Sequence, residues 1–242
     1  MIFAILLAAA AAVADPSKCP HNWTYQRQAD WGGECRTGQH QSPIDLSSAR
    51  DNTSLQPIVF EYGGFPLSVL NNEFYYQVPN AQNCKIKLKI NNVEHEYTLD
   101  QFHFHVPAEH TGVAAHAAEM HLVHKRGNEI VVVGVLFSEQ KKANAALEPI
   151  VRLGHIKPAC NTQTSRELFN PESLLPPRGY RKYIHYVGSL TTPDCDPNVQ
   201  FYMMVTPVSA SHEQLQKLGE LGPSNRHPAR PLNGRVPQRS TH

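Results

Sequence analysis

The chain has 242 residues, of which 40% are hydrophobic, enough for one substantial core and typical of neither disorder nor a collagen-like repeat. Its 22 Lys and Arg residues nearly balance 21 Asp and Glu residues, which excludes an overall charge that would attract nucleic acid or an acidic membrane. We therefore expect a small-molecule substrate and no nucleic-acid partner. Fourteen histidines are many for this length, and imidazole is the commonest metal ligand.

The first fourteen residues predict a signal peptide. Residues 1–14 are apolar and rich in alanine, and they end in Ala12-Val13-Ala14, a small-x-small cleavage pattern. The remaining 15–242 would form the mature domain, exported to the periplasm or the extracellular space. A spanning helix needs about 20 apolar residues, so we expect no membrane anchor.

Alternating and β-branched runs predict a fold dominated by strands. In chain order the predicted strands are 58–62, 75–78, 85–90, 95–99, 101–105, 119–124, 130–137 and 200–206, and the predicted helices are 141–153 and 209–218. No linker or repeat divides the chain. The expected fold class is mixed and β-dominated, a single domain built on a large, mostly antiparallel, twisted β-sheet with short peripheral helices.

Two histidines of the predicted strand 101–105 lie on one face. The strand period of two places Gln101, His103 and His105 together and turns both phenylalanines of this run to the other face. Two imidazoles spaced in this way suit two corners of a zinc tetrahedron. A His-x-His pair alone is more often a packing feature than a metal site, so further residues must decide.

A third histidine and two acceptor side chains favour the metal. In the predicted strand 119–124, Glu119 and His121 share a face, and His121 would complete a three-histidine Zn²⁺ site with one corner open for water if the two strands are neighbours. Gln101 and Glu119 each precede a ligand by two residues, where they can accept its other ring N–H. The pattern predicts Zn²⁺ as cofactor and His103, His105 and His121 as its ligands.

These residues, with several further motifs, resemble the alpha-type carbonic anhydrases, and among them the shorter bacterial and plant-like exported members. The resemblance covers about Asn22 to Gln238, with every motif in the family's order. The motifs are Gln41-Ser42-Pro43-Ile44-Asp45, Leu70-Asn71-Asn72, the two histidine strands, Glu109-His110-Thr111, Tyr186-Val187-Gly188-Ser189-Leu190-Thr191-Thr192-Pro193 and Pro228-Ala229-Arg230-Pro231-Leu232-Asn233-Gly234-Arg235. The resemblance implies a carbon–oxygen lyase that reversibly hydrates carbon dioxide to bicarbonate and a proton by means of a zinc-bound hydroxide.

The resemblance also implies roles for single residues. Thr191 and Glu109 would be catalytic, because an ionised Glu109 only accepts hydrogen bonds and so makes the Thr191 hydroxyl donate to it and accept the hydroxide proton. The main-chain carbonyl of Asn225 would steady His105, and Tyr186 would belong to the surrounding hydrogen-bond network. The implied substrate-binding residues are Val123, Val132, Leu190, Thr191 and Thr192.

One position departs from the family pattern. Fast members carry a histidine two residues after the Asn-Asn pair, which ferries the proton to solvent, and this chain has Phe74 there, preceded by Glu73. We therefore expect an enzyme limited by proton transfer. The cysteines follow the family in part: Cys35 and Cys195 match the disulfide of exported members, whereas the pairing of Cys19, Cys84 and Cys160 stays open.

Two other functions are compatible with parts of the sequence. His103, His105 and Glu109 also resemble the first metal motif of cupin oxygenases, although the flanking glycines of that motif are missing. A storage or binding protein could retain the same fold without catalysis. Whether the protein is a monomer or a dimer is not decided by the sequence.

Overall fold

The computed structural model describes residues 19, 21–79, 83–113, 116–155 and 160–242, so the predicted signal peptide lies outside the described residues. The elements before the middle of the chain are η2 (Tyr25–Asp30), α1 (Glu34–Thr37), β1 (Arg50–Asp51), β2 (Val59–Tyr62), β3 (Phe65–Asn71), β4 (Tyr76–Pro79), β5 (Cys84–Ile90), β6 (Val93–His105) and β7 (Ala118–Arg126). They continue with β8 (Glu129–Gln140), α2 (Glu148–Gly154), β9 (Asn161–Phe169), η3 (Pro171–Leu174), β10 (Tyr183–Ser189), β11 (Pro197–Met204), β12 (Val208–Ser211), α3 (His212–Leu218) and β13 (Gln238–Arg239).

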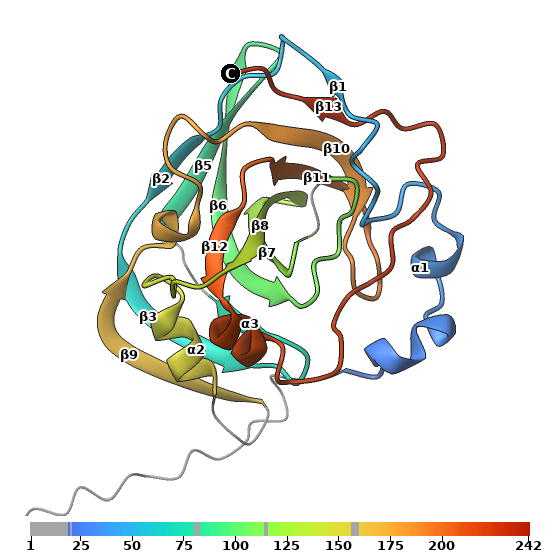
Figure 1. The fold of residues 1–242 in the computed structure, drawn as a ribbon. Helices are drawn as coiled ribbons and strands as arrows, with labels where there is room; N and C mark the ends of the chain where they lie inside the picture. The colour runs from blue at the N-terminus through green and yellow to red at the C-terminus, as the bar shows by residue number, and fades with distance from the viewer. Residues whose placement is uncertain (1–18, 20, 80–82, 114–115, 156–159) are drawn as a thin grey trace, which may run out of the picture.

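The described strands form one 13-stranded sheet whose main path runs β1-β13-β10-β11-β8-β7-β6-β4-β3-β9. Most neighbours are antiparallel, and the parallel pairs are β1 with β13, β11 with β8, and β12 with β8. Figure 1 shows β7 and β8 near the centre of the molecule, with the short helices at its periphery. The fold class is therefore the one expected from the sequence.

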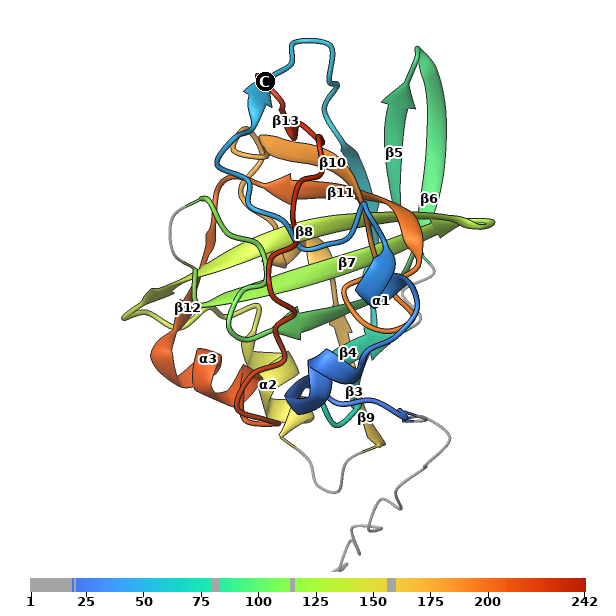
Figure 2. The same cartoon turned by 90° about the vertical axis from the view of Figure 1, so that its right-hand side faces the viewer.

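The long strand β6 connects the centre of the sheet to a projecting hairpin. Its first half pairs with β5, and its second half lies between β4 and β7. Figure 2 shows this β5–β6 hairpin standing steeply to the central strands. The sequence predicted two strands here, 95–99 and 101–105, but they are halves of β6, separated by a register shift between Leu99 and Gln101 against β7.

Both predicted helices begin too early. The segment 141–153 was expected to be helical throughout, but α2 starts only at Glu148, with a proline in its first turn. In the segment 209–218, the first residues belong to β12, which pairs with the end of β8. Ser211 then caps α3, since its side chain accepts a hydrogen bond from the backbone of Gln214 in a complete capping box.

Apolar residues on the two faces of the central strands form separate clusters. Phe102, Phe104 and Leu122 point into the larger core, as the strand period predicted. Val123 and Phe201 belong to a second cluster together with residues of β8 and β10. His103, His105 and His121 alternate with Phe102, Phe104 and Leu122 along β6 and β7, so their rings lie on the other face of the sheet, the face of Val123.

Two disulfides tie the N-terminal segment to the rest of the fold. Cys35 of α1 is bonded to Cys195, 160 residues away, and Cys19 is bonded to Cys160, which directly precedes β9. Cys84 is a buried free thiol in β5. In the described part of the chain, no helix is long and apolar enough to span a membrane.

Candidate metal centre and active site

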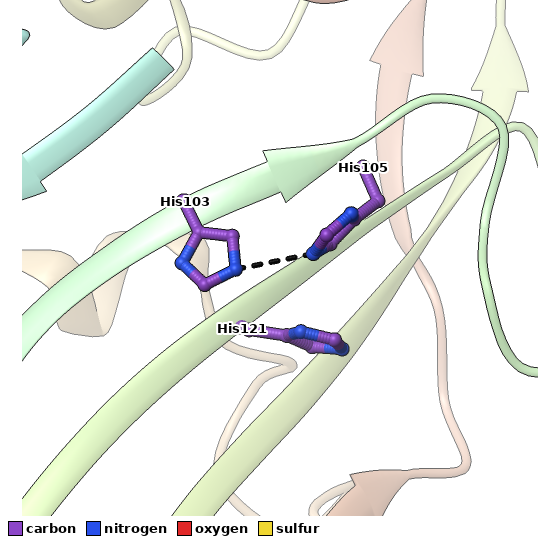
Figure 3. Close-up of side chains that lie close together, drawn as sticks. All are labelled: His103, His105 and His121. Atoms are coloured by element: carbon purple, nitrogen blue, oxygen red, sulfur yellow. Dashed lines mark hydrogen bonds between the residues drawn. The ribbon is translucent and has the colours of Figure 1, made fainter. Parts of the chain in front are cut away.

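Three imidazoles converge where β6 meets β7. His103 lies directly opposite His121 in the antiparallel register, and His105 follows two residues later on the same face of β6. All three side chains are buried, and their potential ligand atoms lie within 4.8 Å of one another. Figure 3 shows the three rings facing a common point, with the Nε2 atoms of His103 and His105 3.1 Å apart.

Each of these rings uses its outer nitrogen for a hydrogen bond. Nδ1 of His103 lies 2.8 Å from Oε1 of Gln101, Nδ1 of His105 lies 2.8 Å from the carbonyl oxygen of Asn225, and Nε2 of His121 lies 2.5 Å from Oε1 of Glu119. Because these partners are acceptors, the outer nitrogens carry the protons and donate. The inner nitrogens therefore present lone pairs toward one another.

Such an arrangement fits a zinc ion. Ligands 2.0–2.1 Å from the metal at tetrahedral corners lie about 3.3 Å apart, close to the observed separation of the two Nε2 atoms. Without a cation, two facing lone pairs at this distance repel each other. Burial is the main reason that the pKa of His103 is well below its ordinary value and that the pKa of His105 is lowered to about 3. Both rings are consequently neutral at pH 7, as metal ligation requires.

Glu119 holds several groups of the site together. Its Oε1 accepts from Nε2 of His121 and from Nδ1 of His110 at 2.6 Å, while its Oε2 accepts from the backbone N–H groups of Glu109 and His110 at 3.0 and 2.9 Å. Burial alone would raise the pKa of Glu119, but the imidazoles of His110 and His121 hold it well below its ordinary value. Glu119 is therefore an ionised acceptor that fixes both a ring and the following turn.

The hydrogen-bond network continues from His110 to the second apolar cluster. The Tyr186 hydroxyl lies 2.6 Å from Nε2 of His110 and 2.8 Å from Oγ of Ser42. The ring of Phe201 stacks on Tyr186 at 5.1 Å and contacts His121 at 5.7 Å. Tyr186 thus lies in a hydrogen-bond network that reaches Glu119 through His110.

Glu109 is completely buried beside the imidazoles. Its Oε1 accepts from the backbone N–H of His227 at 2.8 Å, and its Oε2 has no hydrogen-bond partner of ordinary geometry among the described residues. Burial and the charge of Glu119 raise the pKa of Glu109 well above its ordinary value, and the Thr191 side chain, which lies close by, acts against this. Glu109 and Thr191 are therefore neighbours.

Thr191 belongs to a loop that is closed by the Cys35–Cys195 disulfide. Within the loop, Leu190 N–H donates to the carbonyl of Asp196, and Cys195 N–H donates to the carbonyl of Thr192. Gln41 Nε2 donates to the carbonyl of Cys195 at 3.2 Å. The bonds hold Thr191 against the site, with its side chain buried.

The residues expected to bind substrate are partly brought together. Val123 and Val132 are both buried in the second apolar cluster, and Leu190 packs on its edge. Thr192 follows Thr191 in the loop and is half-buried. Phe74 lies outside this cluster, in an aromatic group with Trp23, Tyr25 and Trp31.

Two further residues lie beside the site. Tyr75 stacks on His103 with ring centroids 4.6 Å apart. The backbone N–H of His227 donates a hydrogen bond to Glu109. Because any residue except proline offers that donor, no side-chain pattern could have revealed it.

The comparisons with known proteins agree with this geometry. The family model described as eukaryotic-type carbonic anhydrase matches residues 18–240. A carbonic anhydrase of Klebsiella pneumoniae is 32% identical over 228 residues, covering 89% of this chain and 89% of the relative, and alpha carbonic anhydrase 3 of Arabidopsis thaliana is 32% identical, covering 93% and 80%. The solved alpha-carbonic anhydrase of Thermovibrio ammonificans in complex with sulfanilamide is 33% identical, with a TM-score of 0.77 over 85% of this chain and 89% of that one.

The chain therefore belongs to the eukaryotic-type carbonic anhydrase family. It is an enzyme of the alpha type, in the class of lyases that hydrate carbon dioxide, and not a cupin oxygenase.

The buried imidazoles predict that the metal-free protein loses stability in acid. Burial lowers the pKa of His105 and His124 to about 3 and of His227 to about 4, whereas the unfolded chain titrates at 6.5. Below pH 6.5 the unfolded state binds more protons than the folded state. Each of these histidines therefore lowers the free energy of unfolding by about 1.4 kcal/mol for every pH unit between 6.5 and its pKa in the folded protein. Glu109 has the opposite effect, because its raised pKa makes the folded state bind one proton more readily than the unfolded state.

Urea unfolding of the protein after removal of metal with a chelator, between pH 7 and pH 4, measures the change of the free energy of unfolding with pH. We expect His124→Gln, which removes one buried imidazole, to reduce the slope by about 1.4 kcal/mol per pH unit. An unchanged slope in this variant would contradict the assignment of His124 as a buried neutral group.

Proposed function

We propose that this chain catalyses the zinc-dependent, reversible hydration of carbon dioxide to bicarbonate and a proton, with Zn²⁺ held by His103, His105 and His121. The observation that carries the proposal is the distance of 3.1 Å between the Nε2 atoms of His103 and His105. The other ring nitrogens of these two histidines already donate hydrogen bonds to Gln101 and to the carbonyl of Asn225. Bound there, Zn²⁺ supplies its Lewis acidity, which in carbonic anhydrases is established to lower the pKa of a coordinated water to about 7.

Gln101, Glu119 and Asn225 then act on the ligands through their outer ring nitrogens. Each acceptor fixes the tautomer and the orientation of one imidazole, so that the inner lone pair is aimed before a metal arrives. The carbonyl of Asn225 cannot change its protonation, and Glu119 is held ionised by its own donors. The ligand set is therefore preorganised by the fold.

Glu109 and Thr191 orient the reacting oxygen. A divalent cation among the neighbouring imidazoles favours the ionised form of Glu109, against the effect of its burial. An ionised carboxylate only accepts, so the Thr191 hydroxyl donates to Glu109, and its oxygen is left to accept a hydrogen bond from the attacking water or hydroxide. This acceptance directs a lone pair of the attacking oxygen at carbon dioxide.

The apolar residues beside the metal centre provide room for the substrate. Val123, Val132 and Leu190 offer no hydrogen bonds, which suits carbon dioxide, an apolar molecule without a strong polar handle. The backbone N–H of Thr191 and the neighbouring Thr192 would face the substrate oxygens. Binding of this kind is weak, and bicarbonate leaves readily.

Proton release limits the turnover. Phe74 stands where a histidine carries the proton in fast members, and its side chain neither accepts nor donates a proton. It is stacked on Trp23 with centroids 4.7 Å apart, within the aromatic group at the N-terminal segment. The remaining routes must use water, buffer or another side chain.

The protein acts outside the cytoplasm as the mature domain 15–242, after removal of residues 1–14. Its two disulfides support an oxidising compartment, either the periplasm or the extracellular space. Its partners are carbon dioxide and bicarbonate.

A direct test of the metal centre compares two buried histidines of β7. We expect the wild type to hold one zinc per chain and to hydrate carbon dioxide, and His121→Ala to lose both. His124→Gln is the matched control, because His124 bonds the Tyr62 hydroxyl at 2.7 Å instead of facing the other rings. Metal analysis by mass spectrometry and stopped-flow hydration measure the two properties. Zinc without hydration in the wild type would favour a storage or binding protein on the same fold.

The orienting pair should behave as one unit. Thr191→Ala and Glu109→Gln are each expected to lower kcat/KM on the order of a hundredfold, since each removes the constraint on the attacking oxygen. The double variant should lose little more than either single variant, because both substitutions remove the same interaction. Thr191→Ser, which retains the hydroxyl, should keep most of the activity, and losses that simply multiply in the double variant would contradict this mechanism.

Limitation by proton release predicts a strong buffer dependence. Turnover should rise steeply with the concentration of small imidazole buffers, which carry the proton that Phe74 cannot carry. Phe74→His should raise turnover at low buffer concentration. Stopped-flow hydration over a buffer series measures both, and turnover that is independent of buffer in the wild type would refute the limitation.

A further inference from the structure

A different imidazole packs against the segment that carries Phe74. His21 packs against Phe74 with ring centroids 4.9 Å apart and against Trp23 at 5.1 Å. At the other end of the same short segment, Tyr75 stacks on His103 at 4.6 Å. Two consecutive residues therefore connect the ring of His21 with the ring of a proposed metal ligand.

His21 is held in this place by covalent and hydrogen bonds. Its N–H donates to the carbonyl of Cys19 at 2.9 Å, and Cys19 is bonded to Cys160. The N–H of Cys160 donates in turn to the carbonyl of Asn71 at 2.7 Å, at the end of β3. The disulfide thus fixes the N-terminal segment to the strand that leads into Phe74.

One ring nitrogen of His21 is available for a proton. The ring forms a hydrogen bond with the backbone of Asn72, and its Nε2 is buried without a hydrogen-bond partner among the described residues. A buried polar atom with no partner is uncommon and calls for a physical reason. An imidazole nitrogen that takes up and releases a proton in turn supplies one.

Two neighbouring groups oppose the effect of burial on the pKa of His21. Burial lowers the pKa of its imidazole, while the carboxylate of Glu73 and the backbone of Asn72 act against that shift. In the part of the chain that the structure describes, Glu73 is the one charged group that acts on this ring. The Tyr25 hydroxyl, also beside Phe74, cannot take the same role, because burial raises its pKa well above the ordinary value.

We infer that His21 is the proton carrier of this enzyme in place of the histidine missing at position 74, an inference that rests on the proposed carbon dioxide hydration. Hydration of carbon dioxide by water yields bicarbonate and one proton. Neutral His21 accepts that proton at Nε2, its one nitrogen with a lone pair, from water that reaches this atom when the half-buried side chain changes rotamer, and becomes an imidazolium. It then gives the proton to a buffer base in solvent and is neutral again for the next cycle. A carrier that must move and is reached only through water leaves proton release the slow step.

Oxygen-18 exchange between bicarbonate and water tests the inference, because it gives two rates for the zinc-loaded enzyme. One rate is the interconversion of carbon dioxide and bicarbonate, and the other is the release of labelled water, which requires a proton. Without added buffer base, we expect His21→Gln and His21→Ala to lower water release at least about tenfold and to leave the interconversion unchanged. Added 4-methylimidazole should restore water release.

The matched control is His212→Gln, at an exposed imidazole that pairs with Glu139 on another face; it should leave both rates unchanged. Water release that persists in both His21 variants would overturn the inference, as would a loss that 4-methylimidazole does not restore. A loss in Glu73→Gln without one in the His21 variants would also overturn it and would assign the role to the carboxylate. Absence of interconversion in the wild type would instead refute the proposed function, and the inference with it.

Discussion

The proposed metal centre depends on the hydrogen bonds that the outer nitrogens of its three imidazoles make with the surrounding fold. Each outer ring nitrogen donates to an acceptor that the fold holds in place, namely Gln101 on the same strand, the carbonyl of Asn225, and Glu119. These bonds decide which nitrogen carries the proton, and so they decide that the lone pairs point inward. Burial then keeps His103 and His105 neutral. The proposed catalysis requires three neutral imidazoles whose lone pairs point at one place and lie close together.

Glu119 extends this constraint to the rest of the site. One carboxylate orients His121, bonds His110 and closes the turn that presents Glu109. Glu109 in turn receives the backbone of His227 and lies beside Thr191. A substitution of any of these residues should therefore alter the hydrogen bonds of the others, because they share acceptors in a buried region.

The sequence predicted the part of the site that follows strand periodicity. Gln101, His103 and His105 on one face of β6, and Glu119 with His121 on β7, required only the alternation of side chains and the assumption that the strands are neighbours. Contacts made through backbone atoms, such as that of the His227 N–H, cannot be predicted from residue type. Among the elements, β3 and β9 were missed. Pro66, which disfavours a strand, stands within the alternation of Phe65, Leu67 and Val69, and β9 is largely polar. The prediction that the helix begins at residue 141 was wrong, because helix propensity does not show where the chain leaves the sheet.

The bond between His105 and Asn225 joins residues that are 120 positions apart. On the ribosome, the pair of histidines in β6 emerges long before the carbonyl that orients one of them. A chain that ends before Asn225 keeps the imidazoles of β6 but lacks the carbonyl that orients His105. The ligand set proposed for Zn²⁺ is therefore complete only after the C-terminal segment has folded against β6, so a truncated chain would retain the histidines without their preorganisation.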